Sequence, residues 1–143
     1  MYAYVFGEVA KLGIEIVGES QMVGYPKQWP SVSMVDWNTG QPNARFWVLK
    51  LLHSNFGPGD KLVRTNIETP SVYGLGFVTR DGKRKVLLVN KRMWTVVASV
   101  PGATGGQFEV VDQQTGFQPS AVSRLGADDV TLGGLAVAVV TLP

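Results

Sequence analysis

The spacing of apolar residues changes once along the chain, near residue 60. Before that point, apolar residues recur every three or four positions in Tyr2–Leu12 and Arg45–Asn55, which predicts two amphipathic helices. Gly13 predicts the end of the first helix. Two short apolar stretches, Ile14–Val17 and Ser31–Trp37, predict strands between these helices. Helices that alternate with strands are typical of a parallel β/α arrangement. Two strands do not make a stable parallel sheet, so this unit is incomplete as a β/α domain.

The second predicted helix is apolar on two sides. One face holds Ala44, Trp47, Val48, Leu51 and Leu52, and a second stripe holds Phe46, Leu49 and Phe56. We therefore expect Trp47 and Leu51 to be buried. Pro42 suits the first helical turn, where the amide that it lacks would be unpaired. Gly57-Pro58-Gly59 predicts the end of the helix.

From Lys61 onward, short apolar stretches alternate with turn residues at a spacing of roughly ten residues. Arg80-Asp81-Gly82 between two such stretches is a hairpin signal. The pattern predicts an antiparallel β-sandwich of seven or eight strands, so the fold class is mainly β. Alternation along the strands predicts a core that contains Val86, Leu88, Val110, Val137 and Val139.

The composition limits the number of domains and the kinds of partner that the chain can have. The 143 residues allow two small domains, which we place at residues 1–59 and 60–143. A net charge of +2 and the short cluster Lys83-Arg84-Lys85 favour a solvated hairpin end and no nucleic-acid partner. There is no apolar run of about 18 residues, so we expect no membrane span. The first residues lack the basic region and unbroken apolar core of a signal peptide, and the compartment is not indicated.

The residue types also limit the chemistry. The chain has no Cys and one His, His53, so a disulfide, a thiolate nucleophile, a Ser-His-Asp triad and a His-rich metal site all lack support. We expect no metal and no cofactor. His53 stands late in the second predicted helix, where a cation would suit the helix dipole.

Several motifs carry a family likeness. PSVSMVDWNTGQPNARFWVLKLLHSNFGPGD, KRKVLLVNKR, VPGATGG, VVDQQTG and the ending DDVTLGGLAVAVVTLP resemble the C-terminal part of a retaining glycoside hydrolase of the (β/α)8 clan, of the family 39 type. The resemblance implies that residues 1–59 are a short remnant of the barrel and residues 60–143 the β-sandwich that follows it. Ile14–Val17 would be barrel strand seven and Ser31–Trp37 strand eight. Strands one to six are missing from this sequence.

The resemblance also implies catalytic residues. The nucleophile of this clan is a Glu at the end of strand seven, the place of Glu19. Retaining hydrolysis needs a second carboxyl group, and Asp36 ends the neighbouring strand, about 4.8 Å across the sheet. The alternatives are a solvated loop position for Glu19 and a turn cap for Asp36.

Aromatic residues surround these predicted strand ends. Tyr25, Trp29 and Trp37 could stack against sugar rings as a substrate-binding subsite, or could pack the loop over an apolar surface. For Trp94, in the sandwich, core or edge packing is favoured over a glycan platform.

Two functions follow as hypotheses. The first is a glycoside hydrolase-like protein that degrades plant or algal polysaccharide by a retaining carboxylate mechanism. The alternative is a non-catalytic accessory or carbohydrate-binding β-sandwich. In either case the partner is a carbohydrate. The strand edges of Ile14–Val17 and Ser31–Val35 and the apolar side chains of Phe6, Val9 and Trp47 also predict a homo-oligomer.

Overall fold

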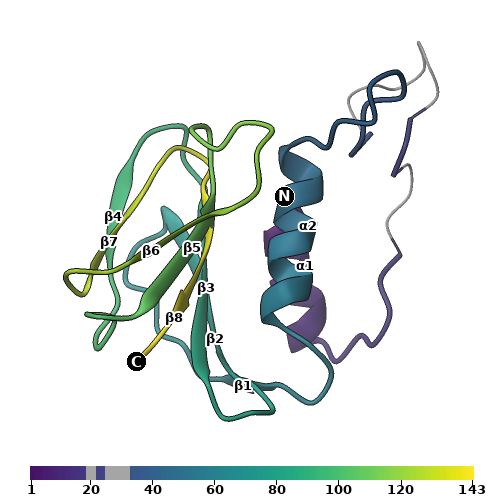
Figure 1. The fold of residues 1–143 in the computed structure, drawn as a ribbon. Helices are drawn as coiled ribbons and strands as arrows, with labels where there is room; N and C mark the ends of the chain where they lie inside the picture. The colour runs from purple at the N-terminus through teal and green to yellow at the C-terminus, as the bar shows by residue number, and fades with distance from the viewer. Residues whose placement is uncertain (19–21, 25–32) are drawn as a thin grey trace.

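The computed structural model describes residues 1–18, 22–24 and 33–143, and its elements form three layers (Figure 1). One layer consists of the helices α1 (Tyr2–Lys11) and α2 (Ala44–Asn55). The strands of the other two layers are β1 (Lys61–Val63), β2 (Val72–Val78), β3 (Arg84–Asn90), β4 (Val96–Ser99), β5 (Gln107–Val111), β6 (Ala121–Arg124), β7 (Asp129–Leu132) and β8 (Val137–Thr141). The predicted mainly β fold, with two helices before an antiparallel sandwich, is confirmed.

The middle layer is a six-stranded antiparallel sheet with the order β1-β2-β3-β8-β5-β6. The strands β4 and β7 pair with each other as a second, two-stranded sheet. The predicted hairpin joins β2 to β3, where the amide of Thr79 donates to the carbonyl of Lys83 at 2.8 Å. Gly82 in that hairpin has φ +84°, a left-handed conformation that glycine adopts without strain.

The inner strands of the six-stranded sheet are covered on both faces, whereas the edge strands β1 and β6 are exposed. The described residues therefore form two hydrophobic clusters, one on each face of the sheet. Val137 and Val139 belong to the cluster between the sheet and the helices, whereas Leu88 faces the two-stranded sheet. Val86 and Val110 are half-buried on that second side. These five residues are therefore covered as predicted, but the expected single core is wrong. Successive side chains of a strand point to opposite faces, and here each face has its own cover.

Two glycines of β2 let a loop lie close to the sheet. A Cβ at Gly74 would collide with Ile67, and a Cβ at Gly76 would collide with Val63. The amide of Gly76 donates to the Thr65 hydroxyl at 2.7 Å. The predicted strand Lys61–Ile67 is therefore correct only as far as Val63, because the chain then crosses over β2.

Helix α1 packs on the sheet through its smallest residues. Ala3 and Gly7 are buried, and the Tyr4 ring meets the Tyr73 ring edge to face at 5.0 Å between centroids. The helix ends before Gly13, which has φ +70°, as the sequence predicted.

Helix α2 begins at Ala44, one residue before the predicted range Arg45–Asn55 and two residues after Pro42. Asn43 is the N-cap, and its side chain accepts hydrogen bonds from the amides of Arg45 and Phe46. The prediction that Pro42 lies in the first turn is wrong, because Pro42 precedes the cap and bridges to Val35.

The predicted burial of this helix is confirmed for Leu51, which is 1% exposed. Trp47 is half-buried against the same cluster, and its indole Nε1 donates to the carbonyl of Phe117 at 2.9 Å.

The predicted β/α strands do not form in the described residues. Residues 14–18 are exposed and have no regular secondary structure, so the strand Ile14–Val17 is wrong. Part of Ser31–Trp37 lies outside the described residues, and the rest holds only isolated bridges from Val35, parallel to Val23 and antiparallel to Pro42. A strand needs a neighbour for its backbone groups, and in the described residues the six-stranded sheet offers none to this segment.

Neither α1 nor α2, the helices of the described ranges, is long and apolar enough to cross a membrane.

Candidate functional site

The predicted site residues belong to the segment that precedes α2. Glu19, Tyr25 and Trp29 lie outside the described residues, so the structure places neither the predicted nucleophile nor two of the predicted stacking aromatics. Asp36 and Trp37 are described, and both are exposed on the turn before α2.

Asp36 organises that turn. Its Oδ1 accepts hydrogen bonds from the amides of Asn38 and Thr39 and from the Thr39 hydroxyl, at 3.0, 2.8 and 2.9 Å. The hydrogen bonds from Thr39, with a smaller one from Asn38, lower the pKa of Asp36 because they favour the carboxylate. The turn-capping alternative accounts for all these contacts. A general acid needs the opposite shift of pKa, so this environment suits an ionised partner and not a proton donor.

Trp37 stands beside Asp36 on a turn that is tied to the start of α2. The amide of Asp36 donates to the carbonyl of Gln41 at 2.9 Å, and the Asn43 side chain donates to the carbonyl of Ser33 at 2.6 Å. The Trp37 side chain is 53% exposed. Its ring has accessible surface on a braced turn, which a stacking subsite requires, and its role in binding stays a prediction.

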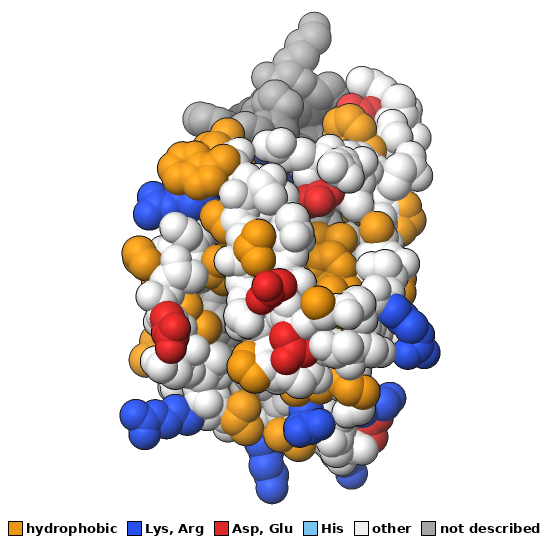
Figure 2. Space-filling model, turned by 90° about the vertical axis from the view of Figure 1, so that its left-hand side faces the viewer, with side chains coloured by type: hydrophobic (Ala, Val, Ile, Leu, Met, Phe, Trp, Pro, Cys, Tyr) orange, Lys and Arg blue, Asp and Glu red, His pale blue; other side chains and the backbone are white. Residues whose placement is uncertain are grey.

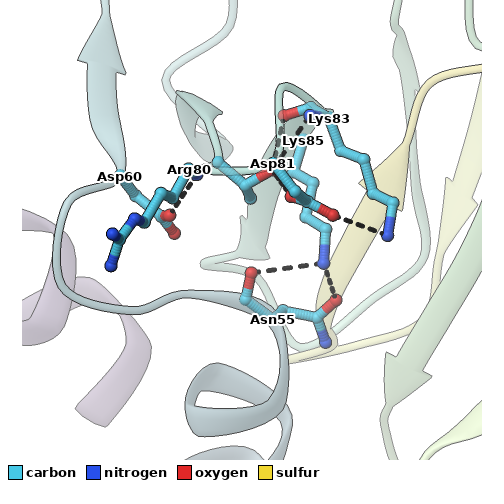
Figure 3. Close-up of polar contacts among 7 residues, drawn as sticks. Asn55, Asp60, Arg80, Asp81, Lys83 and Lys85 are labelled. Atoms are coloured by element: carbon cyan, nitrogen blue, oxygen red, sulfur yellow. Dashed lines mark hydrogen bonds and ion pairs between the residues drawn. The ribbon is translucent and has the colours of Figure 1, made fainter.

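The structure also has an open hollow of about 590 Å³ at the opposite end of α2 (Figure 3). It lies between the last turn of α2 and the β2–β3 hairpin. Its lining consists of Ser54, Asn55, Phe56, Gly57, Asp60, Thr79, Arg80, Asp81, Lys83 and Lys85. None of the sequence patterns marked this end of the helix as a functional site.

Asn55 connects the three elements around the hollow. Its Nδ2 donates to the carbonyl of Leu51 at 2.9 Å and to Oε2 of Glu109 at 2.8 Å. Its Oδ1 accepts from Lys85 Nζ at 2.8 Å, and Lys85 also reaches the Asn55 carbonyl at 3.2 Å. Asn55 is only 8% exposed, so these bonds satisfy a buried amide and join α2 to β3 and β5.

The charged groups of the hollow are held by close partners. Asp60 accepts from the amides of Gly57 and Arg80, both at 2.9 Å. The Thr79 hydroxyl and then Lys83 lower the pKa of Asp81 to about 2. Burial, followed by repulsion from Lys83, lowers the pKa of Lys85.

These contacts indicate a structural role, in which polar side chains hold the end of α2 to the sheet. The Asp60 carboxylate caps backbone amides. The Asp81 carboxylate is paired with Lys83 and its pKa is lowered, whereas a general acid needs a raised pKa. Within the described ranges, no three His, Cys, Asp or Glu residues are grouped as metal ligands. A usable sequence signal was present, because Asn55 interrupts the apolar end of the helix and faces the charged segment Arg80–Lys85.

Comparisons with known proteins give a likeness of fold. No family model matches the chain, and no curated protein matches it. Among solved structures, a GH30 endoxylanase from Clostridium papyrosolvens C71 has a TM-score of 0.57 and 18% identity over 76% of this chain. The catalytic domain of GH30 xylanase C from Talaromyces cellulolyticus has a TM-score of 0.62 and 16% identity over 79%. A glycoside hydrolase family 30 subfamily 8 xylanase from Clostridium acetobutylicum has a TM-score of 0.60 and 17% identity over 78%.

The chain corresponds to only part of those proteins, since the matches cover 30%, 28% and 30% of their lengths. These neighbours carry the family 30 description, and the finer likeness to family 39 is not shown. The coarser prediction of a glycoside hydrolase fold is confirmed. This chain is therefore similar in fold to about three tenths of a family 30 xylanase.

Proposed function

We propose that this chain is the helix-and-sandwich part of a glycoside hydrolase that acts on plant or algal polysaccharide. The observation that carries the proposal is the extent of the fold match. Residues 60–143 make up less than three fifths of the chain, so matches over 76–79% include part of the helical segment as well as the sandwich. This supports two units, residues 1–59 and 60–143, which keep the order of a barrel end followed by a sandwich.

The proposed chemistry is retaining hydrolysis with Glu19 as the nucleophile. The second carboxyl group must lie about 5–5.5 Å away and be protonated when the bond breaks. Asp36 is the candidate within the chain, but its hydrogen bonds favour the ionised form. This favours an acid from another copy of the chain, with Asp36 as the group that shapes the turn. Trp37, with Tyr25 and Trp29, would supply the sugar-stacking surface.

The test is hydrolysis of xylan and of aryl β-xylosides by the full chain. We expect Glu19→Gln to reduce hydrolysis to the uncatalysed background, because the covalent glycosyl intermediate cannot form without the carboxylate. Asp36→Asn, the matched control, keeps the Oδ1 acceptor and should retain most of the activity.

A 2-fluoro-xyloside that traps the intermediate should then label the peptide that contains Glu19, as seen by mass spectrometry. Label on another peptide, or no hydrolysis of any glycoside, would contradict the catalytic proposal.

A second candidate function is a non-catalytic carbohydrate-binding module. It is favoured by the carboxylates of Asp36, Asp60 and Asp81, which are all engaged in hydrogen bonds or an ion pair. Binding of xylan without any hydrolysis would support this second function over the first.

A further inference from the structure

The loop between β3 and β4 presents a large aromatic ring to solvent. The Trp94 side chain is 62% exposed, and its neighbour Met93 is 67% exposed. Leu135 is 50% exposed, and its amide donates to the carbonyl of Arg92 in the same loop, at 2.8 Å. Trp94 is therefore not a core residue, and edge packing and a glycan platform stay as the two alternatives. We call Met93, Trp94 and Leu135, with Arg92, the Trp94 platform.

One buried side chain, that of Asn90, hydrogen-bonds to the backbone of this platform. Asn90, which is 1% exposed, donates through Nδ2 to the carbonyl of Trp94 at 2.8 Å and to the carbonyl of Gly133 at 2.8 Å. Its Oδ1 accepts from the amide of Arg92 at 2.8 Å. Breaking these bonds would leave a buried amide unpaired, so the loop is braced against movement.

The Trp94 ring is also positioned from one side. The Arg92 guanidinium carbon lies 5.6 Å from the centre of the ring, a cation–π distance. Arg92 is itself anchored, because its Nε donates to the Ser71 hydroxyl at 3.1 Å. Ser71 thus holds Arg92 near the Trp94 ring, while Trp94 remains 62% exposed.

Leu135 adds an apolar side chain in an unusual backbone conformation. Its φ is +58°, the only positive value among the non-glycine residues that the structure describes. For a side chain as large as Leu this conformation costs about 1–2 kcal/mol. The preceding Gly134 packs so tightly that a Cβ there would collide with the backbone of Met93. An outward-facing Leu at a strained position beside an exposed Trp indicates a surface used for contact.

The dimensions of the platform favour a small ligand over a protein. A stable protein interface buries roughly 800 Å² on each partner, whereas an aromatic side chain supplies about 150–250 Å². On the side of the molecule that carries the two-stranded sheet, apolar side chains occur in small groups between polar atoms and do not form one continuous area (Figure 2). One fixed ring beside the Arg92 cation and the Ser71 hydroxyl matches the size and mixed polarity of a sugar ring.

We propose that the Trp94 platform is a carbohydrate-binding site, in which a pyranose ring of a polysaccharide stacks its C–H face on the indole. Arg92 would hold the opposite side of the ring and donate to sugar hydroxyls at the edge. Trp94 leads into β4, which lies on the side of the six-stranded sheet away from α2, so this site is separate from the turn of Asp36 and Trp37 (Figure 1). The proposal rests on the proposed carbohydrate function and assigns it a binding surface on the sandwich.

The test measures binding of the full chain to xylohexaose by titration calorimetry and to soluble arabinoxylan by affinity electrophoresis. We expect Trp94→Ala to weaken binding at least tenfold and Trp94→Phe, which keeps a ring, to weaken it less than threefold. The melting temperature should not change, because the side chain is mostly exposed. Phe117→Ala, which removes an aromatic residue that is 61% exposed and belongs to neither site, is the matched control and should not change binding. Trp37→Ala is measured beside it and reports on the stacking surface of the proposed function.

The possible outcomes separate this inference from the proposed function. Loss of binding in Trp94→Ala, in a protein with or without hydrolysis, supports the platform. Equal binding by Trp94→Ala and the unaltered chain overturns it, and loss in Trp37→Ala alone leaves the proposed function in place. No binding of either glycan by the unaltered chain overturns both the platform and the binding module. A change of oligomeric mass in Trp94→Ala, with glycan binding intact, would show that the platform binds protein instead.

Discussion

At the scale of single residues, the polar side chains mainly hold the backbone in place. Asp36 caps a turn, Asn90 braces a loop, and Asn55 joins a helix to the sheet. Each forms at least three hydrogen bonds to groups that would otherwise need solvent. A buried amide that is left without hydrogen-bond partners lowers the stability of the fold more than an exposed one does. Substitutions that remove the partners of such buried side chains should therefore be destabilising.

The first prediction concerns Asn55. Asn55→Ala removes the bonds to Leu51, Glu109 and Lys85 together, and we expect the free energy of unfolding to fall by about 2–3 kcal/mol. The measurement is a urea titration followed by circular dichroism. Ser54→Ala, on the exposed side of the same turn, should stay within about 0.5 kcal/mol of the unaltered chain. Equal effects of the two substitutions would mean that the Asn55 network does not stabilise the fold.

At the scale of elements, the helices attach to the sheet by two different means. Helix α2 uses large side chains such as Leu51 and Leu52, whereas α1 comes close through Ala3 and Gly7. The close approach of α1 brings its backbone against Tyr73, and Lys11 Nζ lies 4.8 Å from the centre of the Tyr73 ring. The fit of α1 therefore depends on the absence of a side chain at Gly7.

The second prediction tests that fit. In an exposed helix, Gly→Ala stabilises by about 1 kcal/mol, because Ala has the better helix propensity. At Gly7 the new Cβ would collide with the Tyr73 ring and hydroxyl, so we expect a destabilisation of about 1–3 kcal/mol instead. Gly57→Ala is the control, since a Cβ there meets open space. Thermal melts of both variants show whether each substitution raises or lowers the stability of the chain. A Gly7→Ala variant that is more stable than the unaltered chain would refute the close contact between Gly7 and Tyr73.

At the scale of the whole molecule, the N-terminal part of the chain does expose apolar side chains. These are not the side chains that the sequence predicted to be exposed. Phe6 and Trp47 were predicted to be part of an open patch, and both pack against the core cluster instead. The exposed apolar side chains lie after α1, where Leu12 is 76% and Ile16 is 88% exposed. With Ile14 and Val17 they form an apolar segment that lacks a partner strand among the described residues.

The third prediction is that this segment mediates self-association. A homo-oligomer would cover it with a second copy and would bring two sets of carboxyl groups together. Light scattering after size exclusion should give a mass above 15.5 kDa at low micromolar concentration, and Ile16→Glu should reduce it towards that value. Val97→Glu, an equally apolar position that is 60% exposed on β4, should have no effect. A monomeric chain with a cooperative melt would contradict this prediction.

Local features of the fold and site could be predicted because they depend on neighbours in sequence. The hairpin at Arg80-Asp81-Gly82 and the stop at Gly13 follow from backbone preferences, and both were located to the residue. The eight strands of the described residues follow from alternation and turn spacing, since a side chain's face depends only on its position along the strand. The turn cap at Asp36 was likewise one of two alternatives that the sequence left open.

Only the tertiary structure decided what lies opposite each residue. Leu88 and Val139 have the same pattern in sequence, yet they lie in different clusters because the sheet is the middle layer. Ile14–Val17 has the composition of a strand, but a strand forms only where another one offers its backbone groups. Asn55 and Glu109 are 54 positions apart, and no sequence pattern links them until the helix packs on the sheet. Spacing along the chain therefore determined the elements, and packing between distant segments determined their burial and hydrogen bonds.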